Sequence, residues 1–266
     1  MIAGAPSFAP QRRLADVVVV GSGLAGMACA LALAPKKVLL LTKTAELAGG
    51  SSQWAQGGVA VVRAGDDHAD IHMADTLAAG DQANEPPVVR HLAERGPKVI
   101  QQLIDSGMCF DRDMDGNLLL AREGGHTRRR ILHAGGDATG AGLVACLSGL
   151  VRKAPHIDVV TGAFAWDLIT GEDGCHGLLA RVDGEGWLAF QAPHVVLACG
   201  GIGQLFSHTT NPVESTGDAL ALAGRAGLPL RDLEYVQFHP TALASDSLPE
   251  GATRPLLTEA LRGDGA

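Results

Sequence analysis

Residues 16–26 of this chain read DVVVVGSGLAG. Four consecutive valines are typical of a parallel β-strand that is covered on both faces. Gly21, Gly23 and Gly26 follow with the G-x-G-x-x-G spacing. In that pattern the first glycine permits a tight turn, the second lets a pyrophosphate approach the backbone, and the third lets the next helix pack close to the strand. Because a helix N-terminus offers free N–H groups and a partial positive charge to phosphate, the stretch predicts a dinucleotide site.

The bulk composition is that of a soluble α/β protein. The chain has 266 residues, of which 46% are hydrophobic and 19% charged, so it can bury a full core in one or two domains. The net charge of −8 argues against nucleic acid or an anionic membrane as the main partner. No segment reaches the roughly 18 apolar residues of a transmembrane helix. Residues 1–13 lack the apolar core of a secretory signal and are predicted to be a flexible end.

The cysteines indicate a reducing compartment. There are five of them, they are scattered along the chain, and none forms a C-x-x-C pair. An odd, dispersed set is typical of free thiols in a cytoplasmic protein, with neither a disulfide framework nor a metal site.

The order of the predicted elements favours an FAD domain over an NAD domain, which remains the alternative. A helix at 24–33 and a second strand at 38–42 complete a βαβ unit. That strand ends at Lys43, where NAD enzymes usually carry an acidic residue that binds ribose. A third parallel strand, an antiparallel meander and a return strand ending in glycines come later. Further helices are predicted at 67–81, 87–106 and 215–226, and another is capped by residues 137–140 and runs through 153. A hairpin is predicted at 111–120, and strands at 157–161, 164–170, 175–182, 187–191 and 194–199.

Four features can carry chemistry, and each also has a plainer interpretation. The loop at 49–58, GGSSQWAQGG, lets the backbone come close to a flat or charged molecule, or is a flexible linker. Glu123, beside two glycines, is either held in an unusual backbone position or solvated in a turn. Asp218 begins a helix, where the dipole favours a negative charge. Its carboxylate either contacts a ligand or simply caps the helix. His239 is a functional residue or a loop histidine.

Several motifs resemble those of the succinate dehydrogenase/fumarate reductase flavoprotein family, and within it the branch that oxidises L-aspartate. The resemblance runs from about residue 16 to residue 266, nearly the whole chain. Its motifs are GSGLAG at 21–26, AQGG at 55–58, REGGH at 122–126, RRILHA at 129–134, TTNP at 209–212, QFHPTAL at 237–243 and LLTEALRG at 256–263.

This resemblance implies an α/β fold with two parts. Residues 1–232 would form the first, incomplete segment of a Rossmann-like FAD-binding domain of the glutathione-reductase type, with an antiparallel meander. Residues 233–266 would begin a substrate-capping domain that is cut short. The family's substrate-binding and proton-transferring arginines would lie beyond Ala266, so the chain alone is expected not to turn over aspartate.

The resemblance also implies FAD as the cofactor. Ser51 matches the position where respiratory members carry the histidine that bonds FAD covalently, so the cofactor would be held non-covalently. The FAD contacts implied are Gly21, Ser22, Gly23, Leu24, Ala25, Gly26, Lys43, Ser51, Ser52, Gln53, Trp54, Ala55, Gln56, Gly57, Gly58 and Asp218.

The implied reaction is oxidation of L-aspartate to iminoaspartate, with oxygen or fumarate as electron acceptor. Glu123 matches the glutamate of the aspartate-oxidising members, and a carboxylate can orient a substrate ammonium through a charge-assisted hydrogen bond. The dicarboxylate would be held by Gln237, His239, Thr258 and Glu259. The product would enter NAD biosynthesis in the cytoplasm, with a possible hand-off to quinolinate synthase. Two other functions stay open: a soluble fumarate reductase or succinate dehydrogenase-like flavoprotein, and a non-catalytic FAD-binding fragment.

Overall fold

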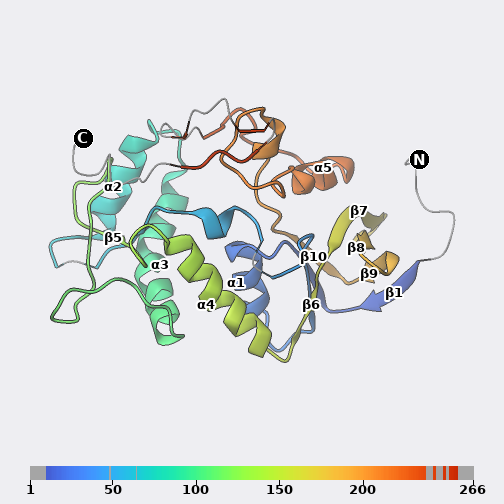
Figure 1. Cartoon of the computed structure of the whole chain (residues 1–266). Helices are drawn as coiled ribbons and strands as arrows, with labels where there is room; N and C mark the ends of the chain where they lie inside the picture. Colours follow the sequence, from blue (N-terminus) through green and yellow to red (C-terminus); the bar gives the residue numbers. More distant parts are fainter. Residues whose placement is uncertain are drawn as a thin grey trace. The chain divides into compact units, whose positions relative to one another are not determined.

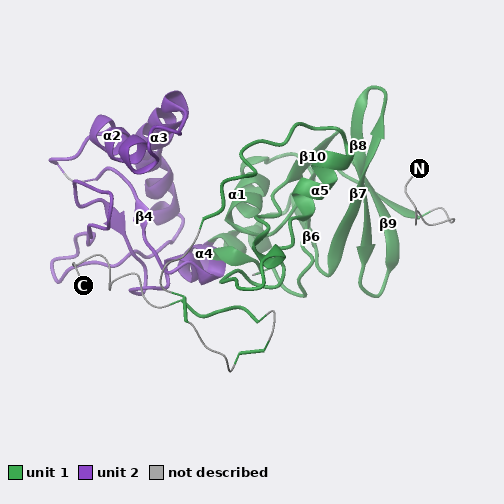
Figure 2. Ribbon diagram, turned by 90° about the horizontal axis from the view of Figure 1, so that it is seen from above, with its two compact units in different colours: residues 1–52, 147–256 green, residues 53–146, 257–266 purple. Residues whose placement is uncertain are grey.

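The computed structural model describes residues 10–47, 49–63, 65–237, 242–243, 248–249 and 252–256. The chain divides into two compact units, coloured separately in Figure 2. Unit 1 comprises residues 1–52 and 147–256, and unit 2 comprises residues 53–146 and 257–266. The sequence did not predict that residues 53–146 separate from the rest. The predicted boundary at 232/233 stays a prediction, because most residues between 238 and 266 lie outside the described part of the chain.

Unit 1 is built on a four-stranded parallel sheet. Its strands are β2 (Val17–Val20), β3 (Val38–Leu41), β6 (Ile157–Val160) and β10 (His194–Leu197), in the order β10-β2-β3-β6. All three pairings are parallel. Every residue of β2 and β3 is buried, as the unbroken apolar runs require of strands covered on both faces. The predicted βαβ unit and the third parallel strand are therefore confirmed.

The two faces of this sheet are covered by different elements. Helix α1 (Leu24–Ala32) packs on β2 and β3 on one side. The antiparallel meander, whose presence was predicted, lies on the other side, and Figure 1 shows the sheet between them. Its strands are β7 (Ala163–Gly171), β8 (Gly174–Val182) and β9 (Gly186–Gln191). Residues of both sheets, among them Val18, Leu39, Leu178 and Phe190, share one buried core.

The prediction that residues 1–13 form a flexible end is wrong for Gln11, Arg12 and Arg13. These residues belong to β1 (Gln11–Leu14), which pairs in parallel with β9 at the edge of the meander. An edge strand leaves backbone N–H and C=O groups unpaired, and β1 satisfies them. Arg13 adds an ion pair with Glu185, with 2.6 Å between Nη2 and Oε2. Residues 1–9 lie outside the described residues.

Unit 2 contains two packed helices and a short two-stranded sheet. Helices α2 (Ala69–Ala79) and α3 (Pro86–Asp105) contact each other. Strand β4 (Val59–Ala60) pairs antiparallel with β5 (Ile131–Leu132). The predicted hairpin at 111–120 is reduced to a single antiparallel bridge between Arg112 and Leu118. Helix α4 (Thr139–Lys153) begins in unit 2 and ends in unit 1, and η1 (Ser51–Trp54) runs from unit 1 into unit 2. Unit 1 also contains η2 (Gly203–Leu205) and α5 (Asp218–Arg225).

None of the helices in the described part of the chain is long and apolar enough to cross a membrane.

Candidate functional site

The glycine-rich turn between β2 and α1 has the geometry that its spacing predicts. Gly21 has a φ of +108°, which L side chains rarely adopt, and its N–H donates to the Leu41 carbonyl at 2.8 Å. A Cβ on Gly21 would collide with the carbonyl oxygen of Ala198, the residue after β10. A Cβ on Gly26 would collide with the carbonyl oxygen of Gly21. The first glycine thus makes the turn, and the third lets α1 approach the sheet.

The second glycine leaves the N-terminus of α1 open. Gly23 is the N-cap residue in an extended conformation, and a Cβ there would contact only Ser52 Oγ, at 3.3 Å. The N-cap residue Gly23 has no side chain that could cap the helix, the first turn of α1 has no acidic residue, and the Leu24 N–H reaches Ser52 Oγ at a long 3.3 Å. Unsatisfied N–H groups and the positive end of the dipole together suit a phosphate group.

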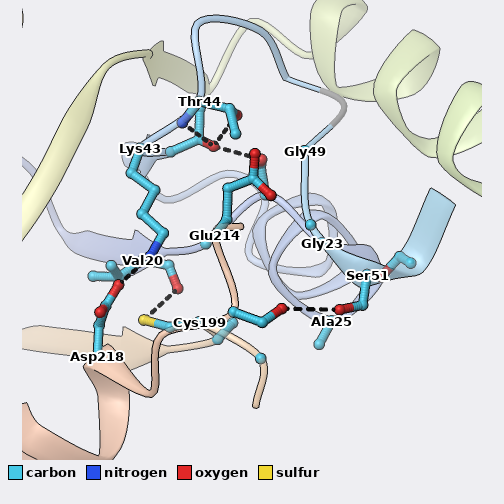
Figure 3. A pocket seen from close by; sticks show the side chains of 18 of the residues that line it. Val20, Gly23, Ala25, Lys43, Thr44, Gly49, Ser51, Cys199, Glu214 and Asp218 are labelled. Carbon is cyan, nitrogen blue, oxygen red and sulfur yellow. Dashed lines mark hydrogen bonds and ion pairs between the residues drawn. The ribbon is translucent and has the colours of Figure 1, made fainter. Parts of the chain in front are cut away.

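This turn forms one wall of a cavity of about 340 Å³ that lies entirely within unit 1. The other walls come from the ends of β3 and β10, the loop before η1, the start of β7 and the segment leading into α5 (Figure 3). Such a position, beyond the carboxyl ends of parallel strands, is where open α/β sheets bind ligands.

Lys43 and Asp218 join two walls of the cavity. The Lys43 Nζ lies 2.6 Å from Asp218 Oδ2 and 2.7 Å from Thr216 Oγ1, and Figure 3 shows the lysine side chain extended toward the aspartate. The Thr216 hydroxyl also donates to Asp218 Oδ1 at 2.7 Å. A cation therefore stands two residues after β3, and the carboxylate comes from the first residue of α5 instead. A fixed carboxylate in this place can accept hydrogen bonds from the hydroxyl groups of a nucleotide.

Two further cavity residues limit the chemistry of the site. The Ser51 hydroxyl lies 3.0 Å from both Asn211 Oδ1 and Ser215 Oγ, so it is held by neutral partners. The Cys199 thiol also lines the cavity, and burial, followed by the negative charge of Asp218, raises its pKa to about 11. Cys199 therefore stays protonated at neutral pH and is a poor nucleophile.

Most of the predicted cofactor residues in unit 1 line this cavity. They are Gly21, Ser22, Gly23, Leu24, Ala25, Lys43, Ser51, Ser52 and Asp218. Gly26 shapes the turn from behind, and residues 53–58 belong to unit 2. Residue-level prediction missed several lining residues, although Gly200 and Gly201 end the return strand and Asn211 lies in the TTNP motif. Those missed include Thr42, Thr44, Gly49, Gly50, Cys199, Gly200, Gly201, Asn211, Glu214 and Ser215.

Within unit 2, His133 lies between Glu123 and Gly58, the last residue of the predicted FAD loop. Glu123 Oε1 lies 3.0 Å from His133 Nε2, and both side chains are about one-quarter exposed. A Cβ on Gly58 would lie 3.0 Å from the same His133 nitrogen. Of the other predicted substrate residues, Gln237 is exposed. His239, Thr258 and Glu259 lie outside the described residues.

The loop that carries Glu123 is anchored by a buried ion network. Arg130 is fully buried and forms two bonds to Asp67, at 2.9 and 2.7 Å, and one to Asp75 at 2.7 Å. The Thr127 N–H and hydroxyl also donate to Asp75, at 2.9 and 3.0 Å. Burial alone would raise the pKa of Asp75, but the bonds from Thr127 and Arg130 outweigh it and lower the pKa.

Comparison with known sequences gives a matching family model and many similar relatives. The family model described as "FAD binding domain" matches residues 16–266. The L-aspartate oxidase of Streptomyces coelicolor is 49% identical over 259 residues, covering 95% of this chain and 44% of the relative. The L-aspartate oxidase of Mesorhizobium japonicum is 46% identical, covering 94% of this chain and 48% of the relative. The chloroplastic L-aspartate oxidase 2-b of Nicotiana tabacum is 42% identical, with 95% and 40% covered. This chain thus spans less than half the length of these curated relatives.

Solved structures give the same fold. The quinol fumarate reductase of E. coli matches with a TM-score of 0.83 and 33% identity, over 88% of this chain and 40% of that one. A flavocytochrome c3 fumarate reductase in its open conformation also matches with a TM-score of 0.83, at 27% identity, over 97% of this chain and 47% of that one. The fold prediction, a mixed α/β flavoprotein with a parallel sheet, is confirmed.

Proposed function

The chain belongs to the FAD binding domain family, and from that premise we propose that it is the FAD-carrying part of an L-aspartate oxidase. The observation that carries this proposal is the bond of Glu123 to His133, whose ring lies beside Gly58 of the predicted FAD loop, in a chain 49% identical to a relative named L-aspartate oxidase. L-aspartate differs from succinate by its amino group, so a carboxylate is the group that would select it.

The residues of the unit 1 cavity fit FAD. Gly23 leaves space at an uncapped helix N-terminus for the pyrophosphate, and Asp218, fixed by Lys43, can accept from hydroxyl groups. When bound, FAD supplies a two-electron acceptor. Residues 53–58 and Gly26 remain proposed contributors to the same cofactor site, and the glutathione-reductase type of the domain remains a prediction.

We assign the orientation of the substrate ammonium to Glu123. The proposed half-reaction removes the Cα hydrogen with two electrons and one proton from nitrogen, which leaves iminoaspartate. Oxygen, reduced to hydrogen peroxide, or fumarate, reduced to succinate, would then reoxidise the flavin. Gln237, His239, Thr258 and Glu259 are proposed to hold the carboxylates. A cytoplasmic location, delivery of the product to NAD biosynthesis and a hand-off to quinolinate synthase belong to the same proposal.

The test uses the complete gene product loaded with FAD. L-Aspartate added without oxygen should bleach the visible flavin absorbance, and oxygen or fumarate should restore it with formation of hydrogen peroxide or succinate. A flavin that stays oxidised in saturating L-aspartate would contradict the proposal.

Replacing Glu123 with glutamine should separate aspartate oxidation from fumarate reduction. The variant loses one charge-assisted hydrogen bond to the ammonium, so kcat/KM for L-aspartate should fall about 10- to 100-fold. Fumarate has no ammonium, and its reduction by a chemically reduced dye should change less than about threefold. Steady-state kinetics of both reactions on one preparation measure this. Equal losses of aspartate oxidation and fumarate reduction would contradict the role assigned to Glu123.

The same comparison decides the second candidate, a fumarate reductase-like flavoprotein, which is favoured by the fold of the two fumarate reductases. In that case the wild-type protein would reduce fumarate without oxidising L-aspartate, and Glu123→Gln would leave fumarate reduction intact.

The flavin should be released from the protein by acid. Ser51 has a hydroxyl where the resemblance implies a tethering histidine in respiratory members, and it is engaged with Asn211 and Ser215. After acid precipitation the flavin absorbance should therefore appear in the supernatant, matching free FAD carried through the same steps. Flavin retained in the washed pellet would show a covalent bond.

A further inference from the structure

The carboxylate of Glu123 has one hydrogen-bonding side-chain partner among the described residues, His133. The distance from Glu123 Oε1 to His133 Nε2 is 3.0 Å. An ionised carboxylate can only accept, so in this contact the hydrogen lies on Nε2 of the histidine. The second carboxylate oxygen then remains available to another donor.

The backbone around His133 fixes where this donor lies. His133 directly follows β5, whose two residues pair with β4. Its carbonyl accepts from the Asp111 N–H at 2.9 Å. On the side of Nε2, the missing side chain of Gly58 leaves room for the ring, since a Cβ there would lie 3.0 Å from the nitrogen. The small sheet and the Asp111 N–H therefore fix the backbone position of His133.

Glu123 itself lies in a loop with little regular structure. It is followed by Gly124, where a Cβ would meet nothing within 4 Å, and by Gly125, which has a φ of +81°. The network of Arg130, Asp75 and Thr127 fixes the far end of this loop, but it does not contact the Glu123 carboxylate. The side chain of Glu123 is therefore oriented by His133.

We propose that His133 is a positioning residue for Glu123 and thereby sets the preference for an amino dicarboxylate over one without an amino group. This rests on the proposed function. The Nε2–H group of His133 donates to one carboxylate oxygen of Glu123. The other oxygen is then aimed at the ammonium of the substrate, and no bond is made or broken by His133.

The test compares two substitutions at this position in the complete, FAD-loaded gene product. His133→Leu removes the donor, and His133→Gln keeps an N–H group near the place of Nε2. We expect the KM for L-aspartate to rise about 10-fold in His133→Leu, the value of one hydrogen bond to a charged group. In His133→Gln it should rise less than about threefold. Fumarate reduction and FAD content should stay close to wild type in both.

A double substitution shows whether His133 acts through Glu123. In the Glu123→Gln background, His133→Leu should add no further loss of aspartate oxidation, because the charge that His133 positions is already gone. His176→Leu is the matched control. It removes another histidine bonded to a carboxylate, Asp173 at 2.7 Å, on the exposed β7–β8 turn. This control should leave both reactions unchanged.

Three outcomes would overturn the inference. His133→Leu could leave the KM for L-aspartate unchanged, it could lower aspartate oxidation and fumarate reduction equally, or its loss could add fully to that of Glu123→Gln. If the wild-type protein oxidises L-aspartate, each of these outcomes contradicts the role of His133 but not the proposed function. A wild type that does not oxidise L-aspartate overturns both.

Discussion

Replacing Gly26 with valine is expected to abolish retention of FAD. The new Cβ would collide with the carbonyl oxygen of Gly21, which is backbone and cannot turn aside. To relieve the clash, α1 must move away from β2, and the uncapped N–H groups at its start then leave the phosphate position. Overpacking of this kind costs about 1–3 kcal/mol or more, so the affinity for FAD should fall by about 100-fold. The bound FAD per chain after gel filtration measures this.

Two other glycine substitutions separate a lost site from a lost fold. Gly149→Ala lies in α4, where a Cβ meets nothing within 4 Å, and it should keep FAD and gain up to about 1 kcal/mol of stability. Gly23→Ala meets only Ser52 Oγ at 3.3 Å, so the chain should fold while the space for a pyrophosphate shrinks. Circular dichroism reports the fold in each case. Full FAD content in a folded Gly26→Val protein would contradict the prediction.

The nucleotide-binding part of unit 1 was predictable because its signals are local. The valine run of β2 and the spacing of Gly21, Gly23 and Gly26 lie within eleven residues and determine a strand, a turn and a helix. Lys43, two residues after β3, also pointed away from a plain NAD site. Its bond to Asp218 could not be predicted, because the partner lies at the start of α5, far along the chain.

Features that depend on distant partners were missed. The strand β1 has no apolar alternation, and it forms because β9 offers an unpaired edge. In the sequence, Arg130 is the last of three consecutive arginines. In the structure it is fully buried, whereas its neighbour Arg129 is exposed. Nothing local distinguishes the two, since Asp67 and Asp75, which bind Arg130, come from the segment before and within α2.

Replacing Arg130 with methionine is expected to destabilise unit 2 more than any surface change. Asp67 and Asp75 would remain buried without their shared cation, and breaking a buried ion pair in this way costs about 3–5 kcal/mol. Urea unfolding followed by circular dichroism measures the free energy of unfolding. Arg128→Met is the matched control: Arg128 faces an exposed Asp66 at 3.7 Å, and its loss should cost less than about 1 kcal/mol. Similar costs for the two variants would refute the burial argument.

The pH dependence of this cost has a definite sign. In the wild type the pKa of Asp75 lies below its ordinary value, so the network stabilises the folded state above about pH 4 and this stabilisation is lost as the pH falls further. Without Arg130, burial of Asp75 opposes its ionised form, and protonation at low pH relieves the variant. The difference in unfolding free energy between wild type and Arg130→Met should therefore shrink as the pH is lowered toward and below about 4. A difference that stays constant across that range would mean that the cost comes from packing around Arg130 and not from its charge.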